Sequence, residues 1–159
     1  MTVKQERVAE VVRLIVELQD ATQSVDEAAA AHLGVNLTDL RCLRVVVQDG
    51  PTPASDLARA TGLTRSAITF AIDRLEKAGL AVRAIDAIDR RRTLVEPTES
   101  ARRNVASLWG PIEAEGVKTL SRLSSDELAV IADFLHRATK LQNEHARRIK
   151  RAHHDSSAV

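Results

Sequence analysis

The sequence PASDLARATGLTRSAITFAIDRLEKAGLAVRAIDAIDRRR, residues 53–92, decides the fold expected for this chain of 159 residues. It holds two short helical patterns on either side of Gly62, followed by two segments of strand character around an arginine-rich tip. Glycine permits the positive φ of a tight turn, and the small Ala58, four residues earlier, lets two helices approach closely. The stretch therefore predicts a helix-turn-helix that leads directly into a β-hairpin.

End signals set the bounds of the two expected helices. We expect the first over residues 53–61, with Thr52 as its N-cap and Pro53 at the first helical position, where a missing N–H costs nothing. Thr64 then caps a second helix that runs to about residue 77. The apolar interior between the helices is supplied by Leu57, Leu63, Ile68, Ile72 and Leu75.

The outward face of the second helix carries the candidate binding residues. Helix-turn-helix proteins present the first turns of this helix to base edges in the major groove of DNA. Arginine can bond guanine through two hydrogen bonds, and serine or threonine can bond a base or touch a thymine methyl. Taken alone, such residues are equally typical of a solvated helix surface. Once the inward positions are removed, the outward side chains are Arg65, Ser66, Thr69, Phe70 and Arg74.

A β-hairpin is expected next, with residues 80–86 and 93–97 as its strands. Its tip carries Arg90, Arg91 and Arg92. Arginine at such a tip can lie along phosphates or enter a narrow minor groove, whose negative potential attracts it. Three arginines are by themselves typical of a solvated loop. Directly after a helix-turn-helix, they favour a winged helix.

Composition and charge agree with this interpretation. Hydrophobic residues make up 44% of the chain; most are Ala, Leu, Val and Ile, and there is no tyrosine. This composition favours a fold that is mainly α with a small β-hairpin wing. The net charge is only +1, yet residues 59–92 hold eight basic against four acidic side chains, a local charge of +4. The positive charge is thus concentrated on the motif.

Cellular location is constrained by what the sequence lacks. A single cysteine, Cys42, excludes an internal disulfide and fits a reducing cytoplasm. The first residues show no signal peptide, and no apolar run approaches the roughly 20 residues that span a bilayer. We therefore expect a cytoplasmic protein.

Two helices are expected before the motif. Residues 3–31 carry an apolar stripe, which we expect two later helices of the chain to bury. Residues 37–47 form the other helix, with Thr38 as its N-cap. The stripe consists of Val8, Val11, Ile15 and Leu18.

Two more helices are expected after the hairpin. Thr98 caps the first, which extends towards residue 120 and which Gly110-Pro111 kinks or restarts. Ser124 and Glu127 form a capping box before the last helix. Its basic end leads into a Ser-rich tail, residues 151–159, which we expect to be disordered.

These motifs, in this order, resemble those of the MarR family of bacterial winged-helix transcription regulators. The matching segments are TGLTRSAIT at 61–69, DRLEKAGL at 73–80 and DAIDRR at 86–91. The helix order is also similar, with one long helix before the DNA-binding lobe and two after it. The resemblance covers nearly the whole chain.

The resemblance implies a homodimeric regulator, more often a repressor than an activator. Residues 1–34 and 98–150 would form a helical dimerisation region, and residues 35–97 the winged helix-turn-helix lobe. The dimer would bind a pseudo-palindromic operator in double-stranded DNA, with recognition helices in successive major grooves and wings in the flanking minor grooves.

Candidate DNA contacts follow from the resemblance residue by residue. Phe70 departs from the family pattern, where a polar or basic residue is common, so the base preference at this position stays open. Arg91 falls on the wing position that enters the minor groove, with Asp89 and Arg90 beside it. The groove-facing positions of the recognition helix are Thr64, Arg65, Ser66 and Thr69.

Many relatives bind a small, often aromatic and anionic effector between the dimer core and the DNA-binding lobe. Trp109 is the residue nominated for such a pocket, with a packing indole as the alternative. No cofactor or metal is expected, because the five histidines show no ligand spacing. The sequence has no phosphate-binding glycine loop, nucleophile elbow or catalytic carboxylate pair, so we expect no enzyme.

Two alternatives stay open. A winged helix can serve as a protein-interaction module that does not bind DNA, because a fold does not fix a function. Cys42 could instead make the regulator redox-responsive, although its place between Leu40 and Leu43 favours a small buried apolar residue.

Overall fold

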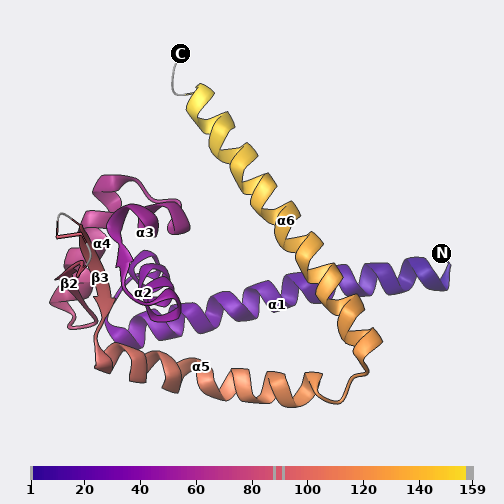
Figure 1. Cartoon of the computed structure of the whole chain (residues 1–159). Coiled ribbons are helices and arrows are strands. Elements are labelled where there is room, and N and C mark those ends of the chain that lie inside the picture. The colour runs from indigo at the N-terminus through magenta and orange to yellow at the C-terminus, as the bar shows by residue number, and fades with distance from the viewer. Residues whose placement is uncertain (1, 88, 91, 157–159) are drawn as a thin grey trace. The chain divides into compact units, whose positions relative to one another are not determined.

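Within residues 2–87, 89–90 and 92–156, the computed structural model of the protein has six helices and a three-stranded sheet (Figure 1). The chain divides into two units, Met1–Gly110 and Pro111–Val159. The elements, in chain order, are α1 (Val3–Leu33), α2 (Leu37–Asp49), β1 (Thr52–Pro53), α3 (Ala54–Thr61), α4 (Arg65–Lys77), β2 (Ala81–Ile85), β3 (Thr93–Pro97), α5 (Glu99–Leu120) and α6 (Ser125–Ser156).

The helix-turn-helix forms where the sequence predicts it. Helix α3 ends at Gly62, whose φ of 69° lies in the left-handed region that glycine tolerates best. Helix α4 begins after Thr64, whose hydroxyl accepts a hydrogen bond from the Ala67 N–H at 3.2 Å. The turn and the cap together fix the direction in which α4 leaves α3.

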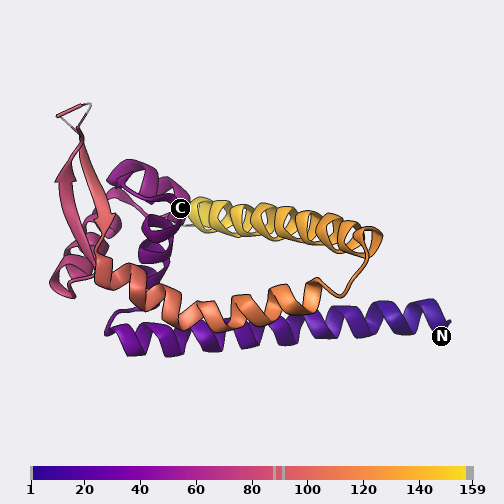
Figure 2. The same ribbon diagram turned by 60° about the horizontal axis from the view of Figure 1, so that its bottom comes forward.

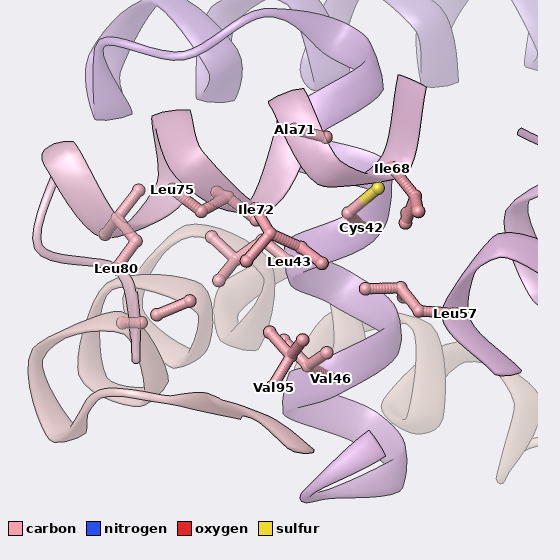
Figure 3. Close-up of a cluster of buried hydrophobic side chains, with 12 residues drawn as sticks. Cys42, Leu43, Val46, Leu57, Ile68, Ala71, Ile72, Leu75, Leu80 and Val95 are labelled. Atoms are coloured by element: carbon pink, nitrogen blue, oxygen red, sulfur yellow. The ribbon is translucent and has the colours of Figure 1, made fainter. Parts of the chain in front are cut away.

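A buried aliphatic core holds α4 against the rest of the first unit. Leu43 and Val46 of α2, Leu57 of α3 and Val95 of β3 meet the inner face of α4 (Figure 3). Burying one such side chain stabilises a fold by about 1.5–3 kcal/mol. The inner face of α4 consists of Ile68, Ala71, Ile72 and Leu75, all at most 1% exposed.

The predicted hairpin is the larger part of a small antiparallel sheet of order β1-β3-β2. Strands β2 and β3 pair from Ala81 opposite Pro97 to Ile85 opposite Thr93. They form a ribbon that extends beyond α3 and α4 (Figure 2). The hairpin therefore has the form of a wing beside the helix-turn-helix.

The start of α3 differs from the prediction. Thr52 and Pro53 do not cap and open this helix; they form β1, which pairs with β3. The Thr52 hydroxyl donates to the carbonyl of Gly50 at 2.8 Å, so it is not available to the helix. Pro53 directly precedes α3, and no side chain makes a capping hydrogen bond at the N-terminus of this helix. Strand pairing across the sheet overrides the local helix signal.

The cap of α2 was also predicted at the wrong residue. Asn36, not Thr38, is the N-cap: its side-chain oxygen accepts from the Asp39 N–H at 2.9 Å. Asn36 has the extended backbone of a capping residue, whereas Thr38 already lies inside the first turn.

The second unit begins inside α5 and contains α6. Helix α5 is continuous through Pro111, so it does not restart there. The predicted capping box precedes α6: the Ser124 N–H donates to Glu127 at 2.8 Å, and the Glu127 N–H donates back to the Ser124 hydroxyl at 3.3 Å. The Ser124 N–H and the Ser124 hydroxyl, which donates to the same carboxylate at 2.7 Å, lower the pKa of Glu127. Helix α6 continues to Ser156, past residue 150, where the sequence placed the start of the tail.

The apolar stripe of α1 is not buried as expected. Val8 and Val11 are 56% and 47% exposed, and Leu18 is also exposed, whereas Ile15 is half-buried. A lone helix cannot bury its own apolar face, and the other described elements of the first unit leave most of this one exposed. In the part of the chain that is described, no helix is long and apolar enough to cross a membrane.

Candidate nucleic-acid interface

The outer face of α4 is a solvent-exposed surface opposite the core. Its exposed residues include Arg65, Ser66, Thr69 and Phe70, and Phe70 is 62% exposed. These are the outward positions that the sequence predicted. Buried and exposed residues fall on opposite faces of α4 because residues three and four apart in a helix share one face.

The hydroxyl groups at the start of α4 already take part in hydrogen bonds within the chain. Thr64 uses its side-chain oxygen to cap α4, and this oxygen lies 3.2 Å from the Ser66 hydroxyl oxygen. The Thr69 hydroxyl donates to the carbonyl of Arg65 at 3.0 Å. By contrast, no hydrogen bond or ion pair engages the Arg65 side chain among the described residues. In the first turn of α4, Arg65 therefore presents an exposed guanidinium that has no partner among the described residues.

Arg74, predicted on the same face, has a structural partner that the sequence reasoning missed. Its Nε and Nη2 atoms donate to the two carboxylate oxygens of Asp39 at 2.8 and 2.7 Å. Asp39 lies on α2 and is 1% exposed, whereas the Arg74 side chain is 46% exposed. These hydrogen bonds raise the pKa of Arg74. The pair ties α4 to α2, so we leave Arg74 out of the proposed DNA contacts.

A second ion-pair group joins the wing to α4. The guanidinium of Arg83, on β2, donates to Asp73 at 2.6 Å and to Glu76, while the Arg83 N–H donates to Glu76 at 2.9 Å. In the sequence, Arg83 stands between Val82 and Ala84 in the predicted strand 80–86, and its two acidic partners were not predicted. Two acids one helical turn apart, next to a strand arginine, are the signal that was overlooked. Arg83 fixes the wing relative to the outer face of α4.

The wing tip carries further positive charge. Arg90 is exposed, and the Arg92 N–H donates to the carbonyl of Asp89 at 2.8 Å. The Arg92 guanidinium lies 4.0 Å from Asp56 of α3, a contact that leaves it half exposed. Arg91, the predicted minor-groove residue, lies outside the described residues.

A cavity of about 730 Å³ lies between α1 and α2. Leu18, Leu37 and Leu40 give it apolar walls, and Arg41 and Arg44 give it positive charge. Arg44 donates to Asp26, also in the lining, at 3.1 Å. The cavity thus combines apolar surface with two guanidinium groups, which suits a small amphipathic anion.

Trp109, nominated from the sequence for an effector pocket, does not line this cavity. It packs on the small cluster of Ala29, Ala30 and Leu40, and its ring centre lies 5.2 Å from the guanidinium carbon of Arg44. Its contact with the cavity is indirect, through Arg44. In the described ranges, no three His, Cys, Asp or Glu residues lie close enough together to hold a metal ion.

Comparisons with known proteins decide the family. The MarR family profile matches residues 35–93. The HTH-type transcriptional regulator YcgE of Bacillus subtilis is 32% identical over 139 residues, which cover 87% of this chain and 90% of that protein. The chain belongs to the MarR family. It is therefore a DNA-binding transcription regulator and not an enzyme.

Solved MarR-like structures share the fold. A MarR family protein from Bacillus stearothermophilus superposes with a TM-score of 0.63 at 17% identity, covering 90% of this chain and 99% of its own. NadR in complex with 4-hydroxyphenylacetate gives a TM-score of 0.59 at 20% identity, covering 77% of this chain and 87% of its own. At such identities, the likeness supports the winged-helix fold alone.

Cys42 of this MarR regulator is a core residue. Its side chain is 0% exposed, and its sulfur points from α2 towards Ile68 of α4 (Figure 3). Burial raises the pKa of the Cys42 thiol from 9.0 to about 11, and the carboxylate of Asp39 adds to the rise. The thiol therefore keeps its proton at neutral pH, whereas redox chemistry requires the thiolate.

Alkaline pH is expected to destabilise the protein through Cys42. The unfolded chain ionises this thiol near 9.0, while the folded chain holds the proton until the pKa of about 11. Between these values the folded state binds more protons, so the free energy of unfolding falls as pH rises, by up to about 2–3 kcal/mol. Urea unfolding of wild type and Cys42→Ala across this window measures the effect. Parallel pH dependences of the two proteins would contradict it.

Proposed function

We propose that the protein is a homodimeric repressor that binds a pseudo-palindromic operator and is released by a small aromatic anion. The observation that carries the DNA-reading part is the outer face of α4, where the Arg65 side chain is exposed and has no partner among the described residues. Arg83 holds the wing beside this face through Asp73 and Glu76. A recognition helix and a wing in fixed relation can engage adjacent major and minor grooves.

The homodimer is supported by the apolar surface left exposed on the long helices. Such surface is costly in water, and a second copy of the same chain is the partner that the family implies. With two copies, the recognition helices would lie about 34 Å apart, one turn of DNA. Helix α1 exposes Val8, Val11, Val12, Val16 and Leu18, and helix α6 exposes Val130, Phe134, Leu135, Leu141 and Ile149.

The effector part is supported by the cavity between α1 and α2. Its apolar walls would accept an aromatic ring. A ligand carboxylate would pair with Arg44 in place of Asp26, or with Arg41. A structural neighbour, NadR, holds 4-hydroxyphenylacetate, a compound of this class. The effector can release DNA only if it binds more tightly to a conformation whose two recognition helices do not fit successive major grooves than to the DNA-binding conformation. Because the target is chromosomal DNA, the proposed location is the cytoplasm.

Selection of bound duplexes from a random pool tests the DNA-reading part. We expect enrichment of an inverted repeat with half-sites about one helical turn apart, and affinity whose logarithm falls linearly with the logarithm of salt concentration. Light scattering in the same buffer should give twice the mass of one chain. A pool that stays random would favour the rival hypothesis, a winged-helix protein-interaction module.

Titration with 4-hydroxyphenylacetate and benzoate tests the effector part separately. We expect at least one such aromatic acid to raise the melting temperature and to release the selected operator, and the Arg44→Ala variant to lose both responses. Release that persists in this variant would place the effector elsewhere.

A further inference from the structure

Phe70 is the large apolar side chain that α4 exposes to solvent. The other large apolar side chains of α4, such as Ile72 and Leu75, lie in the core at no more than 1% exposure. Phe70 lies in the second turn, one turn after Ser66, and 62% of it is exposed. The fold gains little from an aromatic ring left in water. Single exposed apolar residues are common on protein surfaces, so it is the position of this ring, on the face of α4 proposed to enter DNA, that makes it a candidate for contact with a partner.

The polar residues around Phe70 leave few hydrogen bonds for reading bases in this turn. The Thr69 hydroxyl already donates to the Arg65 carbonyl, and Ser66 lies against the capping oxygen of Thr64. One turn later, Arg74 is held by Asp39. In the second turn of α4, the side chain left to contact a base is thus the apolar ring of Phe70.

An apolar ring can distinguish bases in the major groove in one way. Among the groups that base pairs display there, the thymine 5-methyl is the apolar one, and phenylalanine is among the side chains that contact it. Insertion of a ring between base pairs is mainly a minor-groove device, whereas a recognition helix enters the major groove. We propose that Phe70 reads the 5-methyl group of a thymine in each operator half-site. This inference rests on the proposed function, because it assumes that α4 enters the major groove.

The experiment removes single methyl groups from DNA. In the selected operator, each thymine of the half-site is replaced in turn by deoxyuridine, symmetrically in both half-sites. At one position, we expect wild-type affinity to fall about fourfold per half-site, or about fifteenfold for both, the effect of leaving one methyl group unburied. The Phe70→Ala variant should bind the thymine and deoxyuridine duplexes equally, while Phe70→Leu keeps part of the ratio.

A matched control tests whether exposed apolar surface in general causes the effect. Ile85 on β2 is 72% exposed, so Ile85→Ala also removes an exposed apolar side chain, but from the wing. The Ile85→Ala variant should keep the wild-type ratio. A second arm replaces the same thymine by cytosine and by 5-methylcytosine. Wild type, Ile85→Ala and, more weakly, Phe70→Leu should prefer the methylated base, whereas Phe70→Ala should not.

Three results would overturn the inference. Wild type could be insensitive to every deoxyuridine, Phe70→Ala could keep the wild-type ratio, or Ile85→Ala could abolish it as fully as Phe70→Ala does. Because Phe70 and Ile85 both lie outside the core, the three variants are expected to fold, and circular dichroism checks this. A random pool that wild type cannot enrich refutes the proposed DNA-reading function itself, an outcome distinct from enrichment without methyl dependence.

Discussion

The Arg74→Ala variant is expected to unfold at a much lower urea concentration than wild type. Asp39 is 1% exposed, and Arg74 donates to both of its carboxylate oxygens. Removing the arginine leaves this carboxylate buried without a counter-ion, for which the cost is about 3–5 kcal/mol. Water beside the half-exposed Arg74 position places Asp39 at the lower end of this range. Urea unfolding followed by circular dichroism, at one fixed protein concentration, measures the loss.

The Asp39→Ala variant is the matched comparison. It removes the buried charge and leaves a guanidinium that is already 46% exposed and that water can solvate. We therefore expect a smaller loss than for Arg74→Ala, and a double variant that is more stable than Arg74→Ala alone. Small and equal losses in both single variants would show that the pair contributes no more than a surface salt bridge.

The ends of the DNA-reading motif were predictable because their causes are local. Gly62 at the turn and Thr64 at the start of α4 each act within a few residues of themselves. The Thr98 cap, which accepts from the Ala101 N–H at 3.1 Å, and the Ser124 capping box are of the same kind. Because the donor and the acceptor of each such cap lie within a few residues of each other, these helix ends can be predicted from the sequence alone.

The errors concern partners that are distant in sequence. Thr52 and Pro53 have the pattern of a helix start, but β3, more than 40 residues later, pairs with them as a strand. Arg74 is exposed as predicted, but its ion pair with Asp39 was missed, because Asp39 lies 35 residues earlier. A usable signal existed: Asp39 shares a helix face with the buried Leu43, and a carboxylate on an apolar face requires a cation.

The stripe of α1 shows a different limit. Its spacing correctly predicts an amphipathic helix, yet Val8 and Val11 remain exposed in the single chain. A hydrophobic pattern states that a face needs cover and does not state which molecule provides it. The helix could therefore be predicted from the sequence, but the surface that covers its stripe could not. In the proposed function, this surface is provided by the second copy of the chain.

The Arg65→Ala variant is expected to lose operator affinity by about thirtyfold or more, because a bidentate contact to guanine contributes about 1–3 kcal/mol and the proposed dimer makes two. Arg65 stands in the first turn of α4, where recognition helices contact base edges, and its side chain has no partner among the described residues. Competition between the selected operator and random duplex measures the loss of specificity.

Arg59→Ala is the control for charge, since it also removes one arginine from the same unit. The Arg59 side chain is 79% exposed on α3 and pairs with Asp56 at 2.7 Å, so it is engaged where Arg65 is not. Neutralising a phosphate contact weakens binding to all sequences alike and reduces the salt slope by about one, whereas losing a base contact relaxes the preference at one position. Equal losses on operator and random duplex in the Arg65→Ala variant would reassign Arg65 to the phosphate backbone. In that case Phe70 would be the remaining candidate on α4 for direct base recognition, and the deoxyuridine experiment would then test the whole of the helix's proposed specificity.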